Sequence, residues 1–172
     1  FVVENLVRFF ETPYPERDVH GILKEGIRKV NRDLYECTSR DPKLNGAGST
    51  LVLATIKGSV LYVANIGDSR LYLLREALEQ ITKDHSYVEE LVAMGKLKRG
   101  IRDYLEKKNI ITRAVGVSAQ VDTDLFALKL KSGDQILMCS DGLSNMVDEL
   151  EIEYIIRSED GVESRAKALV DA

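Results

Sequence analysis

The chain has 172 residues, 44% of them hydrophobic and 30% charged, which is ordinary for one globular domain with a real core. A net charge of −4 gives no support to nucleic-acid binding, which needs a basic surface. No apolar run approaches the roughly 20 residues of a membrane span, so we expect no membrane association. Two cysteines, Cys37 and Cys139, are too few for a disulfide scaffold and suit a reducing cytoplasm.

Helical spacing opens the chain. Apolar residues recur at three- and four-residue steps within residues 1–11, which predicts an amphipathic helix. Pro13 and Pro15 then interrupt the pattern. The same spacing resumes from Val19 to Leu34 and predicts a second, longer helix.

Strand-like runs follow. Residues 49–56 are rich in branched side chains and end at Lys57-Gly58, a tight turn. Residues 59–74 continue with two runs that are separated at Gly67-Asp68. We interpret these runs as a meander of antiparallel strands.

The second half alternates between helices and strands. Ser86 and Glu89 form a capping box for a helix over residues 86–94, which Gly95 ends. Alternating apolar residues predict a strand over 126–130, and Ile136–Cys139 is predicted to be its hairpin partner across the turn at 131–134. Asp148 can cap another helix, and the last eleven residues are again helical in pattern. Strands joined by tight turns, with helices outside them, indicate an α+β fold with antiparallel sheets.

Two of these strands end in an acid beside glycine. The run Ile136–Cys139 stops at Ser140-Asp141-Gly142, and the run from Val60 to Ile66 stops at Gly67-Asp68. If Asp141 and Asp68 converge, their carboxylates repel unless one is protonated or a cation lies between them. Oxygen ligands without a histidine or cysteine cluster favour Mg²⁺ or Mn²⁺. Each aspartate can equally be a simple turn residue.

The chain resembles a known family in five blocks between residues 46 and 147. They are "GAGSTLVLATI", "LYVANIGDSRLYLL", "ITKDHSYVEELVAMGKL", "NIITRAVG" and "SGDQILMCSDGLSNMV". In order and spacing they are similar to the metal-dependent protein phosphatases of type 2C, the PPM serine/threonine family, particularly its bacterial branch. The resemblance implies an antiparallel β-sandwich with helices on both sides, in four layers, and a metal cluster at one end of the cleft.

The resemblance also implies roles for particular residues. Asp141 matches an aspartate that helps to hold the second catalytic metal, and Asp68 matches a ligand of a third metal in bacterial members. Residues 95–109 match a flap beside the active site, in which Asn109 occupies the place of a residue near the third metal. A polar loop residue is the alternative interpretation of Asn109.

The implied reaction is hydrolysis of phosphoserine and phosphothreonine. A hydroxide shared by two Mn²⁺ or Mg²⁺ ions attacks phosphorus in line, while the ions neutralise charge on the phosphoryl group. The implied partners are phosphorylated proteins, substrates of a serine/threonine kinase, in the cytoplasm.

The sequence departs from the family at both ends. The blocks that would supply the bridging metal ligands, the phosphate-binding arginine and a histidine general acid are expected upstream of Phe1, and another metal aspartate downstream of Ala172. We therefore expect residues 1–172 to be one incomplete catalytic domain with little activity in isolation. The alternative is a non-catalytic, phosphatase-like interaction domain.

Other chemistry-bearing residues have structural interpretations. Cys139 lacks the arginine six positions later that a thiol phosphatase needs, because that residue is Asn145. His85 stands alone, without the companions of a metal or catalytic site, and is expected to shape its loop. The basic residues of segment 96–108 form either a solvated face or a surface for a phosphorylated substrate.

Overall fold

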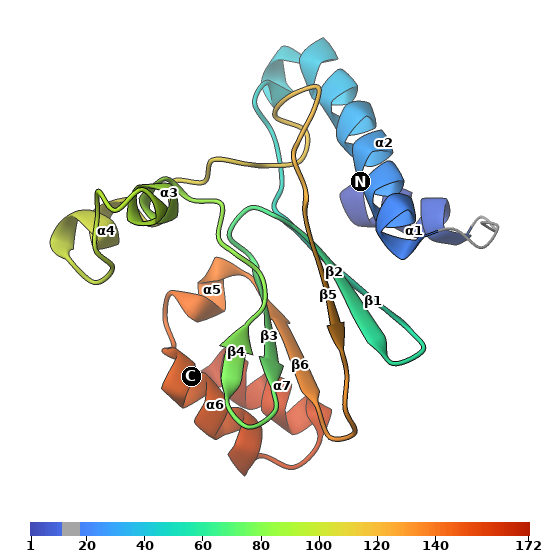
Figure 1. Ribbon diagram of the computed structural model, residues 1–172. Coiled ribbons are helices and arrows are strands. Elements are labelled where there is room, and N and C mark those ends of the chain that lie inside the picture. Colours follow the sequence, from blue (N-terminus) through green and yellow to red (C-terminus); the bar gives the residue numbers. More distant parts are fainter. Residues whose placement is uncertain (12–17) are drawn as a thin grey trace.

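The computed structural model describes residues 1–11 and 18–172 of the chain (Figure 1). Pro13 and Pro15, where a break in the first helical pattern is predicted, lie outside these residues. Among the described helices, none is long and apolar enough to cross a membrane. The helical elements are α1 (Val2–Glu11), α2 (Val19–Arg40), the 3₁₀ turn η1 (Pro42–Leu44), α3 (Tyr87–Ala93), α4 (Arg102–Lys107), α5 (Asp141–Ser144), α6 (Glu149–Ser158) and α7 (Val162–Asp171).

Within residues 1–11 and 18–172, six strands form two three-stranded antiparallel sheets. One sheet has the order β1-β2-β5, and the other has the order β4-β3-β6. The strands are β1 (Leu51–Lys57), β2 (Val60–Ile66), β3 (Arg70–Leu74), β4 (Leu78–Gln80), β5 (Asp124–Lys129) and β6 (Gln135–Cys139). Along the chain, the connections from β2 to β3, from β4 to β5 and from β5 to β6 cross between the sheets.

Two predicted strand pairings are therefore wrong. β5 and β6 are not a hairpin, because β5 pairs with β2 while β6 pairs with β3. Nor do the first three strands form one meander, because β2 and β3 belong to different sheets. Alternation of apolar residues shows which face of a strand is buried but does not name its neighbour, and a short connection can join two packed sheets as well as two paired strands.

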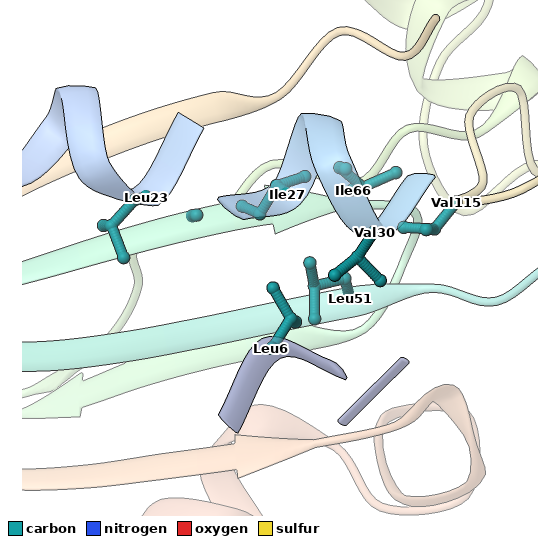
Figure 2. Close-up of a cluster of buried hydrophobic side chains, with 8 residues drawn as sticks. Leu6, Leu23, Ile27, Val30, Leu51, Ile66 and Val115 are labelled. Atoms are coloured by element: carbon teal, nitrogen blue, oxygen red, sulfur yellow. The ribbon is translucent and has the colours of Figure 1, made fainter. Parts of the chain in front are cut away.

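Three apolar clusters define the layers. Leu61 and Val63 of β2 contact Leu71 of β3 in the interior between the sheets. On the outer face of the first sheet, side chains of α1 and α2 pack on β1 and β2, as Figure 2 shows for Leu6, Ile27 and their neighbours. Side chains of α6 and α7 cover the second sheet in the third cluster. The order is helices, sheet, sheet, helices, which confirms the predicted α+β sandwich.

The caps of two helices agree with the sequence. Ser86 Oγ accepts from the backbone N–H of Glu89, and Asp148 accepts from that of Glu151. The reciprocal half of the predicted capping box is absent among the described contacts, because the Glu89 carboxylate instead accepts from Arg99 and Tyr104. The segment of α3 and α4 thereby folds on itself and extends away from the sheets (Figure 1).

Candidate functional site

A small pocket collects the side chains that the sequence indicated. Asp68 lines it from the corner between β2 and β3, Asp141 from the first residue of α5, and Asn109 from the segment just after α4. The open volume is about 20 Å³, room for a water molecule or a single ion. The other lining residues are Arg70, Asp84, Ser86, Tyr104, Lys108, Ser144 and Asn145.

The two predicted aspartates reach the pocket by different local structures. Asp68 lies in the corner that follows β2, as expected. Asp141 lies two residues beyond the end of β6 and begins a single helical turn, in place of the simple turn that Ser140-Asp141-Gly142 suggests. Asn145 Nδ2 contacts Asp141 Oδ2 at 3.3 Å and Asn109 Oδ1 at 3.2 Å. One amide thus connects α5 to the segment that follows α4.

Burial and neighbouring negative charge both act on the Asp68 carboxylate in the pocket. Burial raises the pKa of Asp68, and the nearby carboxylates of Asp141 and Asp84 raise it further. A hydrogen bond to its own backbone and the Arg70 guanidinium oppose this rise without cancelling it. A cation in the pocket would offset both the burial of the Asp68 carboxylate and its repulsion by the neighbouring carboxylates.

Arg70 and Asp84 form one wall of the pocket. Arg70 Nε donates to Asp84 Oδ1 at 3.0 Å, and Arg70 Nη2 donates to Oδ2 at 2.7 Å. Gln80 Nε2 donates to the same carboxylate at 2.8 Å. Because its oxygens already accept three donors, Asp84 acts here as the partner of Arg70, which joins β3 to the loop after β4.

The segment that carries Asn109 is held to α3 by two sets of contacts. The backbone N–H of Tyr87 donates to Ile110 O at 2.8 Å. Glu89 accepts from the Arg99 guanidinium and, at 2.6 Å, from Tyr104 Oη, and the hydrogen bond from Arg99 lowers its pKa in spite of partial burial. This part of the chain is therefore docked beside the pocket by an ionised carboxylate.

The donor set fits part of a site for a hard divalent cation. It consists of two carboxylates and an amide oxygen, which are ligands that Mg²⁺ and Mn²⁺ accept. Within the described residues, however, no group of three or more histidine, cysteine, aspartate or glutamate side chains lies close enough to hold a metal ion. Asp68 and Asp141 would supply two of the ligands and would need others.

Several pocket residues were missed by reasoning from the sequence. Asp84 directly precedes His85 in "TKDHS", but its pairing with Arg70, fourteen positions earlier, is a tertiary contact that no local pattern predicts. The sequence indicates Asn145 only as the residue that stands where a thiol phosphatase has its arginine. The burial of Cys139 raises the pKa of its thiol, which agrees with a structural role for that residue.

Comparison with known proteins identifies the family. The family described as Protein phosphatase 2C matches residues 9–91. The serine/threonine phosphatase stp of Listeria monocytogenes serotype 4b is 39% identical over 154 residues, covering 89% of this chain and 61% of that protein. The chain thus spans about three fifths of the length of such curated relatives.

Solved structures agree with this assignment. Serine/threonine phosphatase Stp1 from Staphylococcus aureus superposes with a TM-score of 0.90 at 30% identity, over 99% of this chain and 68% of that one. The catalytic domain of the phosphatase PstP, solved in complex with two manganese ions, gives a TM-score of 0.85 at 31% identity, over 99% and 70% of the two chains. The chain belongs to the protein phosphatase 2C family.

Proposed function

We propose that the whole protein is a metal-dependent protein serine/threonine phosphatase, and that residues 1–172 are the larger part of its one catalytic domain. The observation that carries the proposal is the convergence of Asp68 and Asp141 in one pocket from two separate strand ends. Burial, and after it the nearby carboxylate of Asp141, raises the pKa of Asp68, which supports a cation as the missing partner of this carboxylate.

In this proposal some residues of the chain bind the metal and others attract the substrate. Asp141 and Asp68 would hold divalent cations, with Asn109 beside them. When bound, such a cation supplies Lewis-acid stabilisation of the charge on a phosphoryl group. Lys108 adds a positive charge to the rim of the pocket, where it can attract a phosphorylated side chain.

The proposal also names the metal, the substrates and the cellular compartment. Mn²⁺ is favoured over Mg²⁺ because the related phosphatase PstP was solved with manganese. The substrates would be phosphoserine and phosphothreonine proteins made by a serine/threonine kinase. Both Cys37 and Cys139 are free thiols, which supports a reducing cytoplasm as the place of action.

The test measures Mn²⁺-dependent release of phosphate from p-nitrophenyl phosphate and from a phosphothreonine peptide by the whole protein. Asp141→Asn should lose most of this activity, whereas Asp160→Asn, an exposed acid between α6 and α7, should keep it. Equal activity in the wild-type protein and Asp141→Asn would remove Asp141 from the reaction.

A second candidate function is supported by the small number of ligands. Because the described residues contain no group of three metal-binding side chains, the domain could serve as a phosphatase-like interaction module without catalysis. Absence of phosphate release from the wild-type whole protein at saturating Mn²⁺, with the fold intact, would favour this candidate over the enzyme.

A further inference from the structure

His85 makes two hydrogen bonds to the corner that carries Asp68. The backbone N–H of Gly67 donates to His85 Nδ1 at 3.0 Å, and the backbone N–H of His85 donates to Gly67 O at 3.0 Å. The first bond fixes the peptide plane that enters Gly67, and the second fixes the plane that leaves it toward Asp68. Glycine has the greatest freedom to rotate between two such planes, and at φ +100° Gly67 uses that freedom.

The orientation of the His85 ring is set by a second pair of residues. Its Nε2 lies 3.2 Å from Asp124 Oδ2, and Arg113 Nη1 lies 2.9 Å from Asp124 Oδ1. Although burial raises the pKa of Asp124, the contacts with His85 and Arg113 outweigh this and lower it, so the carboxylate is ionised and can only accept.

The network defines one tautomer of the ring. Because Nδ1 accepts from Gly67, it carries no proton, and the proton of the neutral imidazole lies on Nε2. Nε2 lies 3.2 Å from Asp124 Oδ2 and 3.3 Å from Arg113 Nη1, and because the guanidinium can only donate, Asp124 is the acceptor of this proton. His85 is also 5% exposed, so water does not compete for either nitrogen. A continuous series of contacts therefore runs from Arg113 through Asp124 and His85 to Gly67, the residue that precedes Asp68.

We propose that His85 is a positioning residue for the metal site: its Nδ1 fixes the Gly67 peptide so that the Asp68 carboxylate faces Asp141, and Asp124 and Arg113 hold the ring in the tautomer that this requires. The inference rests on the proposed function, since it assigns His85 a part in holding the cation and none in contacting substrate. Replacing a residue that orients a metal ligand without touching the metal typically lowers metal affinity 10- to 100-fold.

Two amide variants separate positioning from simple packing. In asparagine the Oδ1 atom is the same number of bonds from Cα as the histidine Nδ1, so His85→Asn keeps an acceptor for Gly67. In glutamine the amide lies one bond further out, near the place of Nε2, so His85→Gln loses that acceptor. Both variants remove the same ring and leave a neutral amide, which makes each a matched control for the other.

The experiment titrates Mn²⁺ alone into the whole protein and measures free Mn²⁺ by electron paramagnetic resonance, with urea unfolding recorded for each variant. His85→Gln should raise the Kd for Mn²⁺ roughly ten-fold or more, whereas His85→Asn should stay much closer to the wild-type value. The Gly67 amide resonance should move strongly only in His85→Gln. If both variants lose affinity equally, or in proportion to their loss of stability, His85 is a packing residue and the inference is overturned.

The wild-type protein supplies a measurement that needs no variant. The ¹⁵N shifts of His85 should report a protonated Nε2 and an unprotonated, hydrogen-bonded Nδ1, and the opposite tautomer would overturn the inference even if neither variant folds. If the wild-type protein binds no Mn²⁺, the proposed function fails. In that case the chemical shift of the Gly67 amide alone tests whether His85 positions the corner. If this resonance does not move in His85→Gln, the inference is overturned.

Discussion

Replacing Gly67 by alanine tests how tightly the Asp68 corner is built. Gly67 has φ +100°, and a Cβ placed there would lie 2.5 Å from Thr50 Cγ2 and 2.8 Å from Thr50 Cβ. Thr50 cannot easily move aside, because its Oγ1 is hydrogen-bonded to Ser69 Oγ at 2.9 Å. The substitution therefore combines backbone strain with a collision.

A matched glycine separates the two costs. Gly133, in the turn between β5 and β6, has φ +89°, but a Cβ there would meet nothing within 4 Å. Gly133→Ala should cost about 1–2 kcal/mol of unfolding free energy, the strain of an L-residue in this region. Gly67→Ala should lose a further ~1–3 kcal/mol, typical of overpacking in a filled interior.

Urea unfolding, followed by far-ultraviolet circular dichroism, gives both free energies from midpoint and slope. The quantity that decides is the difference between the two alanine variants, since the strain at positive φ is common to them. Equal losses at Gly67 and Gly133 would show that Thr50 yields without cost and that the corner is not closely packed, contrary to the geometry described above.

Three further substitutions test other parts of the structure. Asn31→Ala removes three hydrogen bonds that the buried Asn31 side chain makes from α2 to residues 116–119. It should cost about 1–3 kcal/mol in urea unfolding, because the buried backbone N–H of Gly116 loses its acceptor while the carbonyls of the exposed Ser118 and Ala119 can bind water. Arg75 lowers the pKa of Asp134 to about 2. The ionised carboxylate therefore stabilises the fold fully above its ordinary pKa of 3.8, and this stabilisation is lost as the pH falls toward 2. Asp134→Asn should make the midpoint of urea unfolding less dependent on pH over that range. Ile152→Ala, in the α6 core, should cost about 2–5 kcal/mol, while Leu150→Ala on the exposed side of that helix should stay within about 0.5 kcal/mol.

Local patterns predicted the elements well, for a physical reason. Helical periodicity located α1, α2 and α6 because each buries one stripe against a sheet, and Asp148 and Ser86 marked helix starts because they satisfy free backbone N–H groups. The end of α2 extends six residues past Leu34, to Arg40, where the apolar spacing had faded. The short elements β4 and α4 were not predicted, since three or six residues carry too little periodicity.

The partners of the strands could not be predicted in the same way. The residues of β2 are buried on both faces, so its pattern is compatible with any neighbour that is apolar. The turn at residues 131–134 has the composition of a hairpin but joins two sheets, with Asp134 bound to Arg75 at the end of β3. Only the packing of the two sheets on each other decides which connection crosses.

In the candidate site, too, local features were predicted from the sequence and tertiary contacts were not. Asp68 and Asp141 were found because an acid beside glycine at a strand end is visible in the sequence, and Asn109 because of a resemblance. Arg70 and Asp84 were not found, because their relation exists only after β3 and the loop behind β4 are side by side. Whether the three predicted residues bind metal is the part that the experiments above must decide.

The crossings between the sheets explain why the site needs supporting residues. A chain that leaves one sheet for another gives up the ladder of hydrogen bonds, so its backbone groups must find other partners. At the corner between β2 and β3, His85 is hydrogen-bonded to both sides of Gly67, and the neighbouring Asn65 donates from Nδ2 to Lys83 O, in the loop after β4, at 2.8 Å. Asn65 Oδ1 is buried at the same place and has no protein hydrogen-bond partner in the described part of the chain. We therefore expect His85 and Asn65 to hold the corner in the shape that brings Asp68 to the pocket.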